Sequence, residues 1–568
     1  MPEIPQTRLI PFVPKWGACL MLLLAFLTLA ASGAFGQPNL PKLPSPEELD
    51  RALLDSMRIG TSAPELLARL KNQVGDPRAM AKARDILPRL GSEDFDTREQ
   101  ASRELALLGA SILEVLRENS SHSDPEIARR VRDAREAIEE TRSSAVLGAV
   151  IRQLIRAKAP GTAAALLNLA EGAGDPETLD QISRGLVRLA SADSEALERA
   201  TRSDNPRVRW MAGCTLATTL AGKNLARSLL LDKDHGVRWR VALALGRAGE
   251  EAVALPVAVA ELRQANRVAG FELEDWLHQV AGESGPPPLP WPGNEAGRAV
   301  RQKVWQEWLA ARPKIQSPPN RTLTVLLDEG IIRLLDKQSQ PIWELKDIAF
   351  PLDAEYLPGG RVLVAEHGAN RVTIRSTRNE VIWERQVETP LAAQRTPHGT
   401  ILISTADGVL EVDGEGSERR RFVPGGPNDN GVTTIMKSQM LPSGELGLVT
   451  QRRELGEDAF FMRFDREWQP VGALPVRVGT SGGRIEWFAD GRVLVPELDR
   501  NRVAEYDAAG KELWVADAEV PVFATRTPGG STLITSRSDA GAKEVDRAGK
   551  TIWNYKAESR VTRAIRLP

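Results

Sequence analysis

A glycine-containing turn recurs through the second half of the chain, and its spacing constrains the fold more than any other feature. After Pro318 the sequence consists of short runs of Val, Leu and Ile interrupted by Gly, Asp and Pro, which is typical of β-strands. The turns recur every 39 to 47 residues, as LPGG (357–360), TPHG (396–399), LPSG (441–444), FADG (488–491) and TPGG (527–530). A repeat of about 40 residues with several short strands is typical of one four-stranded propeller blade. Residues 318–568 are therefore predicted to form a β-propeller.

The two ends of this region predict the number of blades. Residues 318–345 supply three strands of a first blade but no innermost strand, whereas Val561–Pro568 matches an innermost strand and stops at its Leu-Pro turn. One blade is thus shared between the two ends, which gives six blades and a ring without a free edge. The spacing from the turn to the following Asp is longest in the fourth repeat, and this places an insertion near residues 451–458.

Two kinds of motif in this region resemble those of known propeller families. VLVAEHGANRV (362–372) and VLVPELDRNRV (493–503) look like NHL-type repeats, and DAAGKELW and DRAGKTIW resemble PQQ-like and arylsulfotransferase-like propeller repeats. The resemblance implies the fold but no particular chemistry, because propellers include enzymes, ligand sensors and scaffolds. It implies no cofactor either, since the larger ring and the cysteine features of PQQ-dependent dehydrogenases are absent. Tryptophans recur with the turns and are expected to pack between blades: Trp343, Trp383, Trp468, Trp514 and Trp553.

Residues 76–285 show the three- and four-residue spacing of apolar positions that is typical of helices. DNPRVRWMAGCTLATTL (204–220) is followed after 29 residues by DKDHGVRWRVALALGRAG (232–249), each with Asp at a turn and then Val-Arg-Trp. These segments resemble HEAT or armadillo-like repeats, which implies a curved stack of helix pairs with a concave face for a partner. The Val-Arg-Trp side chains are expected either to line that face or, as we favour, to form the inter-repeat core with the arginines paired to the turn aspartates.

The segments on either side of the helical repeats have different compositions. Residues 37–75 are predicted to be a linker with short helices, and residues 286–317 a Pro-rich linker. The latter includes a helix over 294–312, whose Val304, Trp305 and Trp308 are expected to attach the helical repeats to the propeller.

The first 36 residues predict export from the cytoplasm. Arg8 and Lys15 precede an uncharged run, 17–36, that ends in small residues, which is the pattern of a signal peptide with a mature chain starting near Gln37. The alternative is an uncleaved membrane anchor, because about 20 apolar residues can cross a bilayer. Either interpretation gives a periplasmic or secreted protein, similar to exported bacterial proteins that join these two modules.

Composition and motifs exclude several classes of function. Only Cys214 lies beyond the apolar run that contains Cys19, so the mature chain has no internal disulfide and no cysteine zinc site. The net charge of -2 gives no reason to expect nucleic acid as a partner. No metal or cofactor motif occurs, and no two of the five histidines are closer than 31 residues. Glu366, His367 and Glu497 could hold a metal or act in acid–base catalysis, but we favour acids that bond nearby amides, with Asn370 and Asn501 in left-handed turns.

One array of residues suggests a ligand site in the propeller. Asp353, Lys437, Arg484 and Arg563 occupy equivalent positions near the start of four innermost strands, where Ala392 and Phe523 complete the six. They should surround the mouth of the central channel, next to small residues such as Ala354 and Ala393. Three cations against one acid would favour a small anion. The alternative is a rim of solvated charges without a ligand.

These features predict an extracytoplasmic scaffold that binds protein or cell-envelope partners through the solenoid and the propeller. It would be without a cofactor, and it would contact a membrane only if the N-terminal segment is uncleaved. The alternative function is an enzyme, a hydrolase, lyase or transferase, acting on an anionic substrate at the channel mouth.

Overall fold

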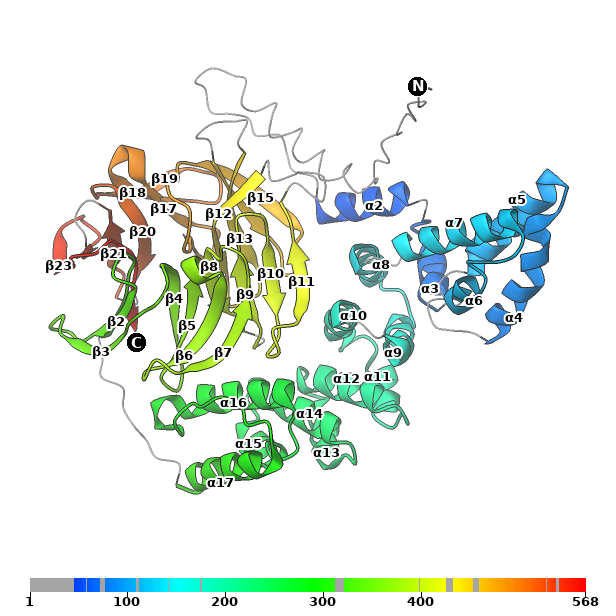
Figure 1. Ribbon diagram of the computed structural model, residues 1–568, viewed down its shortest axis with the longest axis horizontal. Coiled ribbons are helices and arrows are strands. Elements are labelled where there is room, and N and C mark those ends of the chain that lie inside the picture. Colours follow the sequence, from blue (N-terminus) through cyan, green and yellow to red (C-terminus); the bar gives the residue numbers. More distant parts are fainter. Residues whose placement is uncertain are drawn as a thin grey trace, which may run out of the picture.

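The computed structural model describes residues 45–57, 59–71, 77–108, 112–141, 144–173, 176–311, 321–397, 399–424, 433–452, 459–527, 529–537 and 541–567. A curved array of helices is followed by a six-bladed β-propeller, and the array runs around one side of the propeller (Figure 1). The multidomain fold predicted from the sequence is confirmed. The predicted signal peptide lies outside the described residues, as does most of the predicted insertion at 451–458.

The helical array contains sixteen α-helices within the described residues. They are α2 (Pro46–Ser56), α3 (Ala63–Lys71), α4 (Pro77–Ile86), α5 (Phe95–Leu108), α6 (Leu113–Glu118), α7 (Pro125–Thr141), α8 (Ser144–Arg156), α9 (Thr162–Gly172), α10 (Pro176–Leu189), α11 (Ser194–Ala200), α12 (Pro206–Ala217), α13 (Lys223–Ser228), α14 (His235–Arg247), α15 (Glu251–Glu261), α16 (Arg267–Ala281) and α17 (Glu295–Ala311).

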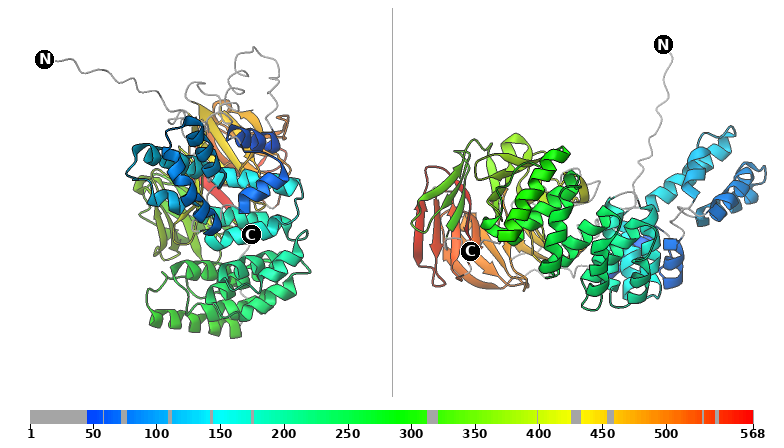
Figure 2. Two further views of the ribbon diagram at one scale, coloured as in Figure 1. Left: turned by 90° about the vertical axis from the view of Figure 1, so that its right-hand side faces the viewer. Right: turned by 90° about the horizontal axis from the view of Figure 1, so that it is seen from below.

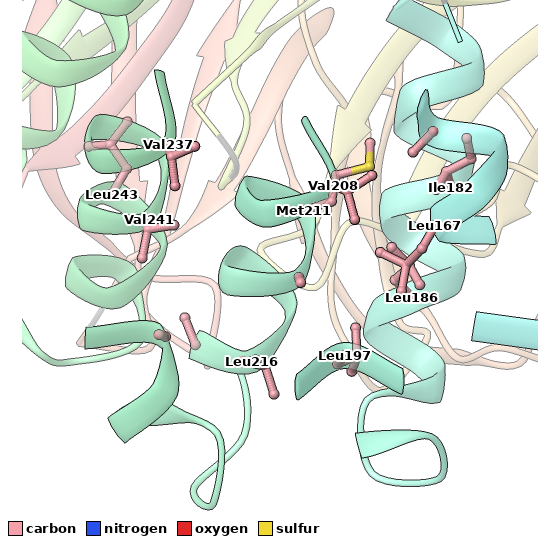
Figure 3. Packing of buried hydrophobic residues seen from close by; sticks show 14 of the residues in the cluster. Leu167, Ile182, Leu186, Leu197, Val208, Met211, Leu216, Val237, Val241 and Leu243 are labelled. Atoms are coloured by element: carbon pink, nitrogen blue, oxygen red, sulfur yellow. The ribbon is translucent and has the colours of Figure 1, made fainter. Parts of the chain in front are cut away.

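The predicted repeat core is present between α9 and α14. Asn205 and Asp234 cap α12 and α14 by accepting backbone N–H bonds, and the apolar residues that follow interlock between neighbouring helices (Figure 3). Arg209 forms two hydrogen bonds with the turn residue Asp232, at 2.7 and 2.8 Å. Arg238 forms the equivalent pair with Glu261 one repeat later, at 2.6 and 3.2 Å. The arginines of the Val-Arg-Trp motif therefore join successive repeats. Arg209 pairs with a turn aspartate as we favoured, whereas the partner of Arg238 is a glutamate at the end of α15.

The helices before residue 76 belong to the array and are not a linker. The carboxylate of Asp50 on α2 is buried and accepts hydrogen bonds from Arg152 and Arg156 on α8, both as short as 2.6 Å. Leu66 and Leu70 of α3 join the same core as α8 and α9. A buried charge needs such partners, so α2 and α3 pack as part of the array. Helices α4–α7 have a separate core and extend away from the propeller (Figure 2).

The propeller consists of six four-stranded antiparallel sheets, each with its innermost strand first in the following list. Blade 1 is β24 (Val561–Leu567), β1 (Arg321–Leu326), β2 (Ile331–Leu335) and β3 (Pro341–Leu345). Blade 2 is β4 (Pro351–Leu357), β5 (Arg361–Glu366), β6 (Arg371–Ser376) and β7 (Val381–Gln386). Blade 3 is β8 (Ala392–Arg395), β9 (Ile401–Ser404), β10 (Val409–Val412) and β11 (Glu418–Phe422). Blade 4 is β12 (Thr433–Met440), β13 (Leu446–Arg452), β14 (Ala459–Phe464) and β15 (Pro470–Val476). Blade 5 is β16 (Glu486–Trp487), β17 (Val493–Glu497), β18 (Arg502–Tyr506) and β19 (Glu512–Asp517). Blade 6 is β20 (Pro521–Arg526), β21 (Thr532–Ser536), β22 (Gly541–Val545) and β23 (Thr551–Lys556).

The ring closes as the sequence predicts, because the last strand joins the first blade. β24 pairs antiparallel with β1 from Arg321 opposite Leu567 to Leu326 opposite Val561, with one register shift. Blade 1 thereby obtains its innermost strand from the other end of the propeller region, and the closure involves no covalent bond.

A turn between the two outer strands of every blade explains the repeated D-x-x-G pattern. Its fourth residue has a positive φ in all six blades, at Ser339, Asn379, Gly416, Trp468, Gly510 and Gly549. Three outer-strand tryptophans donate their indole N–H to the same turn of the next blade: Trp383 to Gly414 at 2.9 Å, Trp514 to Arg547 at 2.9 Å and Trp553 to Ser339 at 3.0 Å. These tryptophans therefore join neighbouring blades.

Trp468 does not lie on an outer strand as the other blade tryptophans do. It occupies the left-handed turn position of blade 4, with φ of 59°. Its ring is buried among residues of blades 3 and 4, and the Arg420 guanidinium lies 3.8 Å from the ring centroid. Trp468 therefore packs between blades, but from the turn, because blade 4 departs from the repeat pattern there.

Helix α16 attaches the array to the propeller, and α17 does not have the role expected from the sequence. Trp305 and Trp308 of α17 pack toward the helices, where Trp305 donates to Glu274 of α16 at 2.8 Å. Another side of α16 faces blades 2 and 3 (Figure 1). A second contact joins α10 to the blade 4 turn through Arg188 and Glu467, 2.6 Å apart.

Candidate functional sites

The central channel contains a buried charge network centred on Asp353. Its carboxylate accepts hydrogen bonds from Arg484 Nε at 3.0 Å, from Arg563 and from the backbone N–H of Ala393 at 3.1 Å. Burial acts to raise the pKa of Asp353, but the charges of Arg484 and Arg563 outweigh it and lower that pKa. The repeat frame thus brought Asp353, Arg484 and Arg563 together correctly, from the innermost strands of blades 2 and 1 and the segment just before that of blade 5.

The balance of charge in the channel differs from the expected three cations against one acid. Glu355 also lies there and accepts from Arg484 at 2.7 Å, and Glu486 lies near Arg484 and Arg563. Lys437 donates to the carbonyl oxygen of Gly482 at 2.8 Å. The alternative of a solvated rim is also wrong, because Asp353, Lys437, Arg484 and Arg563 are all buried. The charge balance was wrong because the acids two positions after Asp353 and Arg484 were not counted.

Two channel groups have pKa values near neutrality. Burial lowers the pKa of Lys437 to about 8, although Asp353 opposes the shift. Burial raises the pKa of Glu486 to about 7. Perturbed values of this kind are common at functional sites, although structural ion networks produce them too.

Glu366, His367 and Glu497 do not form one site. Glu366 accepts from Thr373 at 2.6 Å and from Arg371 and Arg375 within blade 2. Glu497 is bonded within blade 5 by Arg502 and Tyr506, each at 2.6 Å. The Nδ1 atom of His367 lies 3.3 Å from the Pro390 oxygen.

The turns that follow the two glutamates agree with the left-handed Asn turns that we favoured. The other part of that interpretation is wrong, because Arg, Thr and Tyr side chains bond the two carboxylates where nearby amides were expected. Asn370 and Asn501 have the same left-handed backbone, with φ of 51° and ψ of 45°. Their side-chain oxygens accept the N–H of Thr389 and Val520. Within the described parts of the chain, no group of three or more His, Cys, Asp and Glu could hold a metal ion.

A second buried network lies at the junction of the array with the propeller, and the sequence did not reveal it. Asp275 of α16 accepts from Arg361 of β5 at 3.1 Å and from Arg395 of β8 through two donors. Burial would raise the pKa of Asp275, but Arg395 and Arg361 lower it to about 2. Next to it, burial and the charges of Arg361 and Arg301 keep the pKa of His278 well below its usual value.

A cavity of about 690 Å³ opens beside this junction network, in a size range typical of small-molecule sites. It lies between α16, the Pro-rich segment 288–293, the start of α17, and the outer strands of blade 2. We call it the junction cleft. The Pro-rich composition of 286–292 was the only sequence signal there, and it marked a boundary and not a site.

No helix in the described ranges is long and apolar enough to cross a membrane. No protein-family model and no curated protein sequence matches the chain.

Several solved structures are similar to part of the chain. A protein of unknown function from Bacteroides caccae is 14% identical, with a TM-score of 0.28, over 42% of this chain and 73% of that one. A streptogramin B lyase is 13% identical, with a TM-score of 0.32, over 43% of this chain and 86% of that one. The calcium-binding protein regucalcin from Agrobacterium tumefaciens is 13% identical, with a TM-score of 0.30, over 38% and 76%.

Proposed function

We propose that this protein is an extracytoplasmic interaction scaffold in which the helical array and the propeller form one rigid body with separate binding surfaces. The junction carries this proposal, because Asp275 on α16 is buried and bonded by arginines from two different blades. Such a contact fixes the orientation of the two modules, since a buried charge that loses its partners is strongly destabilising. The carboxylates of Asp353, Glu366 and Glu497 are each paired with arginines, which leaves them less suited to acid–base catalysis.

The outer strands of blades 5, 6 and 1 are the propeller surface that we assign to a partner. Leu513, Ile552 and Ile342 each precede the outer-strand tryptophan and are 47%, 55% and 47% exposed. The equivalent residue of blade 2, Ile382, is partly buried and lines the junction cleft. The same apolar position is therefore partly covered where the array meets the ring and exposed elsewhere. The surface proposed for the array is its α4–α7 end, where Phe95 is 61% exposed.

The proposed location rests on residues 1–36, whose pattern is that of a signal peptide. We expect the mature chain to begin near Gln37 in the periplasm or outside the cell, with protein or cell-envelope partners. Mass-spectrometric sequencing of the N-terminus after expression in a bacterial host tests this. An intact Met1 in the membrane fraction would favour an anchor instead.

The scaffold proposal is tested with residues 37–568 immobilised and exposed to an envelope extract. The matched variant carries Leu513→Glu and Ile552→Glu, which charge the exposed outer strands and should leave the melting temperature nearly unchanged. We expect the unaltered chain to retain a specific partner that the variant loses. Identical retention by both chains would rule out this surface. Turnover of an anionic substrate that requires Glu486 would favour an enzyme.

A further inference from the structure

The walls of the junction cleft are aromatic and aliphatic. Phe271 of α16 and Trp383 of β7 have ring centroids 6.2 Å apart, and Ile374 and Ile382 lie beside them in blade 2. Trp291 also lines the cleft and lies against α16, where a Cβ on Gly270 would come within 2.2 Å of its ring. Gly270 therefore lets the Trp291 ring pack close to the helix. The cleft is thus lined by three aromatic rings and two isoleucines, a lining that favours a planar apolar body.

The acids of the cleft are neutralised by their neighbours. Glu274 accepts two hydrogen bonds from Arg301, at 2.5 and 2.9 Å, and a third from the Trp305 indole. Asp275 is bonded by Arg361 and Arg395, as described above. Neither carboxylate is left to attract a cation.

The arginines of the cleft outnumber these acids. Arg267 and Arg298 line it and have no carboxylate partner among the described residues. Within the part of the chain that the structure describes, Arg298 donates only to the backbone oxygens of Arg263 and Gly293. Arg361 also lines the cleft, is 4% exposed, and within the described chain its Nη2 atom has no hydrogen-bond partner. An unsatisfied buried donor of this kind is rare in folded proteins.

We propose that the junction cleft binds an organic anion that has a planar apolar body, such as an aromatic carboxylate. The body would lie between Trp291 and the wall formed by Phe271, Ile382 and Trp383. The anionic group would be placed near Arg267 and Arg298, with Arg361 as a further donor after a small rearrangement. The ligand class follows from the excess of arginines and the aromatic walls together, and it is independent of the partner surface on the outer strands.

Three probes separate the contribution of the anionic group from that of the apolar body. They are 2-naphthoate, its neutral analogue 2-naphthamide, and acetate, which lacks the apolar body. Isothermal titration with residues 37–568 should show 2-naphthoate binding at one site, with 2-naphthamide weaker by about tenfold, a difference of about one charge-assisted contact. Acetate should show no saturable binding. Trp291→Ala should weaken both naphthyl probes.

The decisive variant is Arg267→Gln with Arg298→Gln, and its control is Arg263→Gln, an exposed arginine outside the cleft that pairs with Glu295. We expect the double variant to weaken 2-naphthoate by about fivefold or more, the range for partly solvated charges, and to leave 2-naphthamide unchanged. Unchanged 2-naphthamide binding also shows that the cleft is still folded. Equal affinity for the two naphthyl probes, an equal effect of the control, or no binding of 2-naphthoate would each overturn the proposal.

Discussion

The channel and the junction each contain one fully buried aspartate held by two arginines, but the two networks connect different parts of the molecule. Asp353, in the innermost strand of blade 2, is bonded by Arg563 in that of blade 1 and by Arg484 just before that of blade 5, which are equivalent positions of one repeat. Asp275 links a helix to blades 2 and 3, two elements with no common repeat. The first network maintains the ring and the second sets the orientation of two modules. The comparison teaches that the same local chemistry can serve either a fold or an assembly of folds.

Buried ion pairs of this kind contribute geometry more than net stability. Removing charges from water costs several kcal/mol per ion, roughly what their attraction returns. Removing one partner is costly, however, because the remaining charge stays buried. Each aspartate is therefore a sensitive point at which to separate the stability of the ring from the coupling of the modules.

The largest effect is expected from removing residues 561–568. This deletion takes away β24, the innermost strand of blade 1, together with Arg563. It exposes an unpaired edge and the apolar side chains that β24 buries, at a cost of about 5 kcal/mol or more. Thermal unfolding followed by circular dichroism measures the loss. Partial recovery on adding a peptide of residues 559–568 is the control, and an unchanged melting temperature would contradict the closure.

Replacing each buried aspartate in turn should affect a different property of the molecule. We expect Asp353→Asn and Asp275→Asn each to cost about 3 to 5 kcal/mol at pH 7. In calorimetry Asp353→Asn should lower the unfolding temperature of the propeller. Asp275→Asn should instead split the unfolding into two transitions, one for each module.

The control for both variants is Asp328→Asn, which breaks an exposed pair with Arg560 and should cost less than about 1 kcal/mol. The contribution of Asp275 also has a defined dependence on pH. Its folded pKa of about 2 lies below the ordinary 3.8, so the stabilisation is present above about pH 4 and is lost as the pH falls toward 2. A single transition for Asp275→Asn at every pH would mean that the two modules still unfold together without this carboxylate, so that Asp275 is not what couples them.

A smaller effect is expected for Glu486, which sharpens the account of the channel. Its pKa is raised from 4.5 to about 7 by burial, so its contribution to stability falls as the pH rises through that range. Glu486→Gln should therefore match the unaltered chain near pH 5 and be more stable at pH 8 by about 1 to 3 kcal/mol. Urea unfolding at the two pH values measures this. If the unfolding free energies of the variant and the unaltered chain differ by the same amount at both pH values, Glu486 is solvated.

Sequence reasoning was successful where a repeat supplied a frame. The turn spacing gave six blades, the ring closure and the convergence of Asp353, Arg484 and Arg563. The helical repeats likewise gave the pairing of Arg209 with Asp232. In each case the periodicity assigns equivalent positions, and equivalent positions in a closed ring or a stack are neighbours in space.

Where two different periodicities meet, the sequence offered no such frame. Asp275 is spaced as an ordinary helical residue, and only the docking of α16 shows that it faces Arg361 and Arg395. Trp305 was expected to contact the propeller, but it packs in the helical core. The sequence pattern of its helix does not show which neighbour its apolar residues face. The junction cleft depends on three segments that are far apart in sequence, and no single pattern predicts it.

The central claim is that the array and the propeller form one rigid body, and the distance between them tests it most directly. In residues 37–568 with Cys214→Ser, spin labels are placed at the exposed positions Leu231 and Ile552, by Leu231→Cys and Ile552→Cys. Pulsed electron–electron double resonance should give one narrow distribution of distances between the two labels, and Asp275→Asn should broaden it. A broad distribution in the chain with an intact Asp275 would contradict the claim.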